Sequence, residues 1–150
     1  MSASLRPAKE EDADRLSEIA RTAKAHWGYA PEWLELWRPS LTFDAETIAR
    51  DWMRVAEIDG EAVGVVALSG ESGRVEIEHL WIDPPAMGLG IGRHLVDAAL
   101  AEARSRGASR VEVVADPNAE SFYRHLGAER IGSVDSQPAG RSLPLMVIEL

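Results

Sequence analysis

The sequence contains no cysteine in its 150 residues. This absence excludes disulfide bonds, thiolate metal sites and a cysteine nucleophile, and it agrees with a reducing compartment. Positive charge is also scarce, because 16 Lys and Arg residues stand against 25 Asp and Glu residues and give a formal net charge of −9. Such a surface does not attract DNA or RNA. We therefore expect no nucleic-acid partner, and we interpret the negative charge as a source of solubility.

Long apolar runs are missing as well. No segment approaches the ~20 apolar residues that a membrane-spanning helix requires, and residues Met1–Arg6 contain no signal-peptide core. The four histidines do not have the spacing of metal ligands. These absences predict a cytoplasmic protein without a membrane association or a metal site. A composition of 45% hydrophobic and 27% charged residues predicts that residues 1–150 form a single globular domain.

The order of the helical and extended patterns predicts a mixed α/β fold, in which helices flank a sheet of about six to seven strands. Apolar positions at Leu16, Ile19 and Ala23 give the first helix a face to bury. A long helix between two strands predicts a parallel crossover. Strands are expected at 5–7, 52–58, 62–68, 75–82, 110–115, 128–134 and 145–150, and helices at 9–24, 33–37, 44–50 and 118–126, with a longer one ending near 106.

A proline-punctuated turn and three glycines separate the apolar run Ile77–Ile82 from that long helix. Gly88, Gly90 and Gly92 stand at every second position. Glycines allow a ligand to approach the backbone closely, and the N-terminus of the following helix directs free N–H groups and a positive dipole end to the same place. The segment therefore predicts a site for phosphate, most readily a pyrophosphate. The spacing G-x-G-x-G fits neither the Rossmann fingerprint nor the G-K-[ST] of a P-loop.

Residues 87–92 and 116–128 carry two patterns that occur together in one known family. The first segment resembles [QR]-x-x-G-x-[GA], with Met87 in the Gln/Arg position, and the second resembles N-x-x-A-x-x-F-Y-x-x-x-G-[FA]. These are signatures of the GNAT superfamily of acyl-CoA-dependent N-acetyltransferases, and the sequence is identified as a member of it. Two patterns in the family's order are more specific than either one alone. The second resemblance rests on Asn118, taken as the signature's asparagine, and on Ala119, Phe122, Tyr123 and Gly127.

The resemblance implies that acetyl-CoA is the cosubstrate. Backbone N–H groups of the glycine loop would hold the pyrophosphate, the strand Leu80–Ile82 would pair with the pantetheine arm, and Asn118 would hydrogen-bond that arm. Arg93 either joins this site or is simply solvated. Tyr123 would be the general acid for the leaving thiolate, since a phenol with a pKa of about 10 suits that role; the alternative is an aromatic ring that packs beneath its helix. We expect Phe122 to point into the core and Tyr123 toward the cofactor. The implied cofactor-binding residues are Leu80, Trp81, Ile82, Met87, Gly88, Leu89, Gly90, Ile91, Gly92, Arg93, Asn118 and Tyr123.

Two acids, Glu76 and Glu78, leave the same face of the strand before the glycine loop, because side chains alternate along a strand. In the functional interpretation one of them is the general base that takes a proton from an ammonium acceptor, directly or through water. In the alternative interpretation both line an exposed face and pair with arginine. The sequence does not distinguish which of the two would act. His79 points to the opposite face, where packing is expected ahead of a role as base.

The connection between the first two helices carries His26 and Tyr29, and in similar enzymes this region covers the acceptor site. We expect both to contact the substrate, and residues 140–144 to flank the same pocket by analogy. The resemblance implies direct attack of a primary amine on acetyl-CoA in a ternary complex, with the acceptor open between small-molecule and peptide amines. A coenzyme A-binding regulatory module without turnover is the alternative. Exposed strand edges near 145–150 favour a homodimer.

Overall fold

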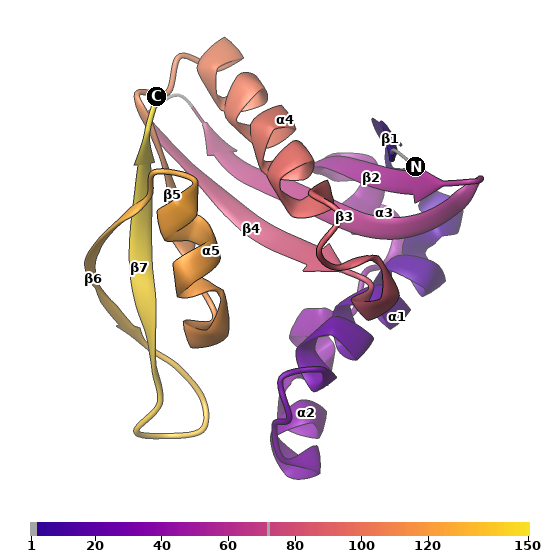
Figure 1. The fold of residues 1–150 in the computed structure, drawn as a ribbon, viewed down its shortest axis with the longest axis horizontal. Helices are drawn as coiled ribbons and strands as arrows, with labels where there is room; N and C mark the ends of the chain where they lie inside the picture. The colour runs from indigo at the N-terminus through magenta and orange to yellow at the C-terminus, as the bar shows by residue number, and fades with distance from the viewer. Residues whose placement is uncertain (1–2, 72) are drawn as a thin grey trace. The chain divides into compact units, whose positions relative to one another are not determined.

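The computed structural model describes residues 3–71 and 73–150, and in this range it contains a seven-stranded sheet in the order β1-β2-β3-β4-β5-β7-β6 (Figure 1). β4 and β5 run parallel, whereas the pairs β1–β2, β5–β7 and β6–β7 are antiparallel. The mixed α/β fold expected from the sequence is therefore confirmed. The strands are β1 (Ser4–Pro7), β2 (Trp52–Ile58), β3 (Glu61–Glu71), β4 (Arg74–Ile82), β5 (Arg110–Val114), β6 (Glu129–Asp135) and β7 (Ser142–Glu149). The α-helices are α1 (Ala13–Ala25), α2 (Pro31–Trp37), α3 (Ala45–Arg50), α4 (Ile91–Ser105) and α5 (Glu120–His125).

Two compact units make up the chain, and each has a buried interior of its own. Unit 1 comprises Met1–Ala67 and His79–Ala98, and unit 2 comprises Leu68–Glu78 and Ala99–Leu150. The elements β3, β4 and α4 contribute residues to both units. The expectation of one domain over the whole chain stays a prediction. The core of unit 1 includes Leu16, Ile19, Trp37, Phe43, Val55 and Val65, so the apolar face expected of the first helix is buried.

The C-terminal strand β7 lies inside the sheet, which corrects the expectation of an exposed edge near 145–150. Figure 1 shows β7, in yellow, between β5 and β6 in unit 2. The edge belongs to β6, whose residues are all exposed.

β7 also begins at Ser142, earlier than expected. A proline that lacks an N–H can still accept a hydrogen bond in a strand, and the carbonyl of Pro144 accepts one of 3.0 Å from the N–H of Ala115.

The connection β4–α4–β5 is the parallel crossover that the long helix predicts. β4 pairs with β5 at Val75↔Val111 and Glu76↔Glu112, and among the described residues the pairing ends there. A parallel neighbour requires a crossover connection, and here the loop 83–90 leads from the carboxyl end of β4 to the start of α4. The side chains that α4 buries completely are Leu95, Val96, Ala99 and Ala103.

Asp44 before the third helix and Asp59-Gly60 between two strands predict a helix cap and a hairpin turn, and the structure confirms both. Asp44 caps α3, where its side chain accepts a 2.8 Å hydrogen bond from a backbone N–H of the first turn. Asp59 and Gly60 join β2 to β3 with φ values of 53° and 81°, as a two-residue type I′ turn requires. The sequence also predicts a turn over 69–73, and this turn is shorter than predicted because β3 continues as far as Glu71. Ser72 of that turn lies outside the described residues.

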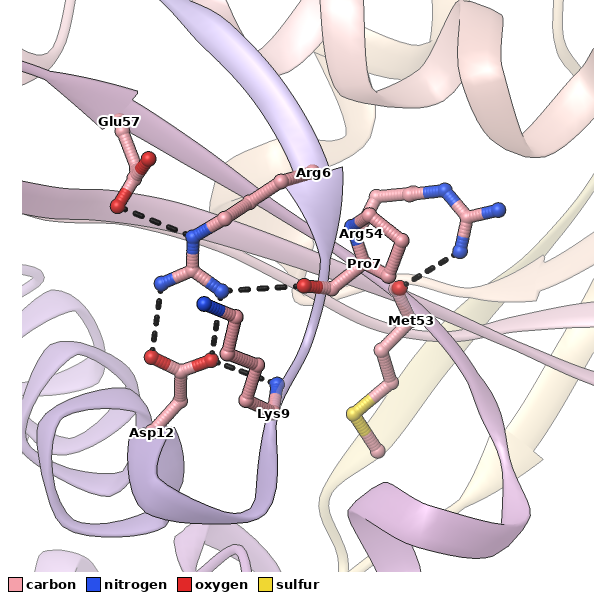
Figure 2. A network of polar contacts seen from close by, with 7 residues as sticks. All are labelled: Arg6, Pro7, Lys9, Asp12, Met53, Arg54 and Glu57. Carbon is pink, nitrogen blue, oxygen red and sulfur yellow. Dashed lines mark hydrogen bonds and ion pairs between the residues drawn. The ribbon is translucent and has the colours of Figure 1, made fainter.

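Arg6 of β1 is held by carboxylates from two other segments of unit 1 (Figure 2). Its guanidinium forms a bidentate ion pair with the Asp12 carboxylate, in which both N–O distances are 2.8 Å. The Arg6 Nε lies 3.0 Å from a carboxylate oxygen of Glu57 in β2. Asp12 also accepts a 2.7 Å hydrogen bond from the backbone N–H of Lys9. The hydrogen-bonded Arg6 guanidinium is the main cause that lowers the pKa of Asp12. The charged carboxylate therefore ties the first strand to the start of the first helix.

Asp12→Asn is expected to lower the free energy of unfolding by about 1–3 kcal/mol at neutral pH, because the partly buried guanidinium loses its carboxylate partner. The depressed pKa means that the wild-type contribution is present above the ordinary carboxyl pKa and disappears as Asp12 becomes protonated in acid. The difference between variant and wild type should therefore shrink below about pH 4. Urea unfolding across this pH range measures both effects.

The matched control is Glu11→Gln, an exposed acid on the same turn, which should change stability by no more than about 0.5 kcal/mol. Equal losses in the two variants would contradict the role given to the Arg6–Asp12 pair.

Candidate active site

The glycine loop ends in the first turn of α4. Gly88 and Gly90 have φ values of +82° and +80°, which L side chains rarely adopt, and a Cβ built on either one meets no atom within 4 Å. Backbone conformation, and not crowding, therefore selects glycine at these positions. Gly92 differs, because it lies inside α4. The N–H of His94 donates to the Gly90 carbonyl at 3.2 Å, so the N–H groups of residues 91–93 precede the first helical hydrogen bond and are available to an anion.

Leu80–Ile82 form the half-buried end of β4 in unit 1. The pairing of β4 with β5 ends at Glu76, so in the described part of the chain no β5 residue pairs with this segment. Next to it, β3 approaches closely at Gly64, where a Cβ would lie 3.0 Å from Ile82 Cδ1 and 3.3 Å from the Trp81 carbonyl oxygen. Glycine at this position therefore allows the close contact between β3 and the end of β4.

His79 is a packed and hydrogen-bonded histidine. Its Nδ1 accepts a 3.1 Å hydrogen bond from the indole N–H of Trp81, and its ring centroid lies 4.8 Å from that of Phe43. A nitrogen that accepts from an indole is not free to take up a proton from a substrate. These contacts agree with the packing role that the sequence favours for His79 over a role as base.

Glu76 and Glu78 lie on the same face of β4 in unit 2, and their surroundings differ. Glu76 is half-buried, whereas Glu78 is exposed. Burial is the main cause that raises the pKa of Glu76, and the nearby carboxylates of Glu78 and Glu112 raise it further. Glu112 stands opposite Glu76 in the β4–β5 register, and it is Glu112 that pairs with an arginine, Arg74 Nε at 3.4 Å. Of the two acids left open by the sequence, Glu76 is therefore the more buried one and the one whose pKa is raised.

Tyr123 is the buried member of the pair in α5, with 4% of its surface exposed. Phe122 is only half-buried, so the expected division, with Phe122 in the core, is reversed. The two rings meet edge to face with their centroids 5.1 Å apart. Burial raises the pKa of Tyr123, because the phenolate form would lose its hydration. The hydroxyl therefore stays protonated through the neutral range, which a proton donor requires.

Measured back from Ala119, the asparagine of the second signature falls at position 116, where this chain has Asp116. The assignment to Asn118 therefore departs from the signature's spacing by two residues. Asp116 Oδ1 accepts hydrogen bonds from the backbone N–H of Asn118 at 2.8 Å and from its side-chain Nδ2 at 2.9 Å. The structure thus places Asn118 against the residue that occupies the signature position.

The two residues expected at the acceptor have different environments in unit 1. His26 is exposed at the end of α1. Tyr29 is half-buried, and its ring centroid lies 4.9 Å from that of Trp37 and 6.0 Å from that of Trp33. Lys24, which the sequence did not single out, places its Nζ 5.1 Å from the Tyr29 ring centroid and 4.7 Å from that of Trp37. Tyr29 therefore belongs to an aromatic cluster that surrounds a buried ammonium group.

The Acetyltransferase (GNAT) family matches residues 13–128, which is more than half of the chain. The chain belongs to the GNAT family. The peptidyl-lysine N-acetyltransferase YjaB of Salmonella typhimurium is 28% identical over 147 residues, and the match covers 97% of both proteins.

Solved structures agree with the fold of this GNAT chain. A GCN5-related N-acetyltransferase from Rhodopseudomonas palustris has a TM-score of 0.82 at 25% identity and covers 100% of this chain and 97% of its own. The PaiA N-acetyltransferase from Thermoplasma acidophilum, solved in complex with coenzyme A, has a TM-score of 0.81 at 21% identity and covers 100% of both chains. Three other N-acetyltransferase relatives are longer, and the chain spans 39%, 23% and 27% of their lengths.

Two further properties of the GNAT chain concern residues 3–71 and 73–150. Within these ranges no helix combines the length and the apolar composition needed to cross a membrane. In the same part of the chain, no three or more His, Asp or Glu side chains come together as potential metal ligands.

Glu76→Gln is expected to leave this GNAT chain as stable as the wild type or more stable at neutral pH. A carboxyl whose folded-state pKa is raised stabilises the fold below the pKa of the unfolded chain and loses that contribution as pH rises through the folded value. Glutamine mimics the protonated form, so the variant should gain on the wild type as pH rises from about 4 to about 7. Urea unfolding at several pH values measures this difference.

Glu78→Gln is the matched control, since it removes the same charge from the exposed neighbour. We expect it to stay within about 0.5 kcal/mol of the wild type at every pH. A variant of Glu76 that is destabilised at neutral pH would show that the carboxylate is favourably solvated or paired, and not desolvated.

Proposed function

We propose that this protein is an N-acetyltransferase that moves the acetyl group of acetyl-CoA to a primary amine by direct attack in a ternary complex. The observation that carries the proposal is the glycine loop, where Gly88 and Gly90 turn the backbone and the first N–H groups of α4 offer a site for a dianion. The coenzyme A in the PaiA complex supports the choice of cosubstrate, and the name of YjaB supports a peptide lysine as the first acceptor to test. The expected location is cytoplasmic.

The cosubstrate would be held mainly by backbone groups. The N–H groups from Gly88 to Arg93 bind the pyrophosphate, and the exposed Arg93 side chain adds positive charge. The backbone of Leu80–Ile82, which has no β5 partner, pairs with the pantetheine arm as an added strand would. Asn118 hydrogen-bonds the same arm. Acetyl-CoA supplies an activated thioester, and the protein supplies orientation and proton transfer.

Glu76 acts as the base in this proposal. Its raised pKa makes it a better proton acceptor than an ordinary carboxylate, and it takes a proton from the acceptor ammonium directly or through one water. The neutral amine attacks the thioester carbonyl, the carbon–sulfur bond breaks, and the thiolate takes the proton of the Tyr123 hydroxyl. His26 and Tyr29 contact the acceptor. The attacking nitrogen loses two protons in all: the first goes to Glu76 before the attack, and the second passes to the Tyr123 phenolate, directly or through water, after the phenol proton has gone to sulfur. The amide is then neutral, and one proton is released to solvent when Glu76 ionises again.

Coenzyme A at about 100 times its dissociation constant is expected to raise the melting temperature by about 5–10 °C, because it binds the native state selectively. Gly90→Glu should abolish this shift, since it places a bulky negative side chain beside the pyrophosphate site. Differential scanning fluorimetry measures the shift in both proteins.

Gly107→Glu is the control for backbone strain. Gly107, at the other end of α4, has the same φ of +80° and open space around it, so the substitution should cost similar stability while the coenzyme A shift is retained. The absence of any shift in the wild type would overturn the cosubstrate assignment. A shift without release of thiol across amine acceptors would instead favour a regulatory module.

Tyr123→Phe is expected to lower kcat by ~10²–10⁴-fold while the dissociation constant for coenzyme A stays nearly unchanged, since the buried ring is kept and only the proton donor is lost. Release of free thiol under single-turnover conditions follows the chemical step directly. Phe122→Leu, a change in the half-buried neighbour, serves as the control and should retain the wild-type rate. A wild-type rate in Tyr123→Phe would assign Tyr123 to packing alone.

A further inference from the structure

The segment after β5 contains a largely covered charge pair that the proposed reaction does not use. The side chains of Asp116 and Arg141 are each 10% exposed, and Oδ2 and Nη2 lie 3.6 Å apart. The pair between Arg130 and Glu120, also in unit 2, has a similar separation of 3.5 Å but side chains that are 43% and 22% exposed. Burying two charges costs hydration that an exposed pair keeps. The position of the less exposed pair, Asp116–Arg141, therefore needs an explanation other than surface charge balance.

Arg141 is anchored within its own loop, the β6–β7 connection. Its carbonyl accepts a 2.8 Å hydrogen bond from the N–H of Ser136, and its N–H donates to the Pro138 carbonyl at 3.1 Å. Its Nη1 lies 3.3 Å from the Ser136 hydroxyl oxygen. These contacts fix both the backbone and the side chain of Arg141. The guanidinium in turn orients the Asp116 carboxylate through the oxygen Oδ2.

The other oxygen of Asp116 orients the Asn118 side chain. Oδ1 accepts from both the backbone N–H and Nδ2 of Asn118, at 2.8 and 2.9 Å. A carboxylate can only accept hydrogen bonds, so it selects the amide orientation in which Nδ2 faces Asp116 and the amide carbonyl points away from it. An asparagine at position 116, as the family signature has, could turn its own NH₂ toward Asn118 and would not enforce this choice.

We propose that Asp116 and Arg141 are positioning residues of the cosubstrate site. Arg141 holds the Asp116 carboxylate, and Asp116 turns Asn118 so that its carbonyl oxygen accepts from an amide N–H of the pantetheine arm. The inference rests on the proposed function, since it assumes that acetyl-CoA is the ligand. It assigns these residues to the pantetheine arm, and it gives them no part in binding the nucleotide.

Two ligands separate the pantetheine arm from the nucleotide. Coenzyme A contains both, whereas 3′-phospho-ADP keeps the pyrophosphate and lacks the arm. In calorimetric titrations, Arg141→Met and Asp116→Asn should weaken coenzyme A by about three- to ten-fold, the value of one lost hydrogen bond. Binding of 3′-phospho-ADP should stay within about twofold of the wild type. Arg130→Met, which breaks the exposed pair of similar separation, should leave both affinities unchanged.

A double-mutant cycle tests whether Arg141 acts through Asn118. If it does, Arg141→Met should cause no further loss of coenzyme A affinity in a protein that already carries Asn118→Ala, because the group to be positioned is gone. Arg141→Lys keeps the charge without the planar fork, so it should restore part of the affinity lost in Arg141→Met.

Several results would overturn the inference while the proposed function survives. The first is wild-type affinity for coenzyme A in both Arg141→Met and Asp116→Asn. The second is an equal loss of affinity for coenzyme A and 3′-phospho-ADP, and the third is additive losses of Arg141→Met and Asn118→Ala. Each result would leave Asp116 and Arg141 a purely structural role. If Arg141→Met does not fold, Arg141→Lys and the near-isosteric Asp116→Asn carry the same test. A wild-type protein that does not bind coenzyme A would overturn the proposed function itself.

Discussion

The proposed cosubstrate site depends on the backbone donors that a helix cannot satisfy at its own N-terminus. In α4 these donors follow two glycines with positive φ, and the parallel return of β5 obliges the helix to start at the carboxyl end of β4. The entry to the loop is fixed as well, since Asp83 donates its N–H to the Val63 carbonyl at 2.8 Å and pairs through its carboxylate with Arg15 at 2.9 Å. The β4–α4–β5 connection and the conformation of the glycine loop together place the proposed dianion site at the N-terminus of α4.

Burial raises the pKa values of two side chains in unit 2, and the chemical consequences differ. It raises the pKa of Glu76 and so makes this carboxylate readier to accept a proton. It also raises the pKa of Tyr123, so this hydroxyl stays protonated at neutral pH and is a weaker acid than an exposed phenol. In the proposed reaction, Glu76 as base and Tyr123 as acid are both in their working protonation states at any pH between their two pKa values. Burial of Glu76 lowers the free energy of unfolding at neutral pH, because a desolvated carboxylate is unfavourable.

Local rules explain most of what could be predicted from the sequence. The Asp59–Gly60 turn, the Asp44 cap and the glycine loop depend on neighbouring residues, and their positions were expected correctly. Strand order is a long-range property, so the insertion of β7 between β5 and β6 could not be read from the pattern of β7 itself. The same limit applies to Glu112, which faces Glu76 only because of the parallel register.

Two lysines, Lys9 and Lys24, are the whole lysine content of a chain with 16 Lys and Arg residues. Lys9 is exposed, but Lys24 is 8% exposed and lies against the rings of Tyr29 and Trp37. An amine must be unprotonated and accessible to be acylated, and the burial of Lys24 restricts access to its amine. Guanidinium groups, which carry nearly all of the positive charge, are poor nucleophiles because they stay protonated. If the protein uses acetyl-CoA as proposed, the exposed Lys9 is the lysine side chain open to acetylation, and burial shields Lys24 from the acyl donor.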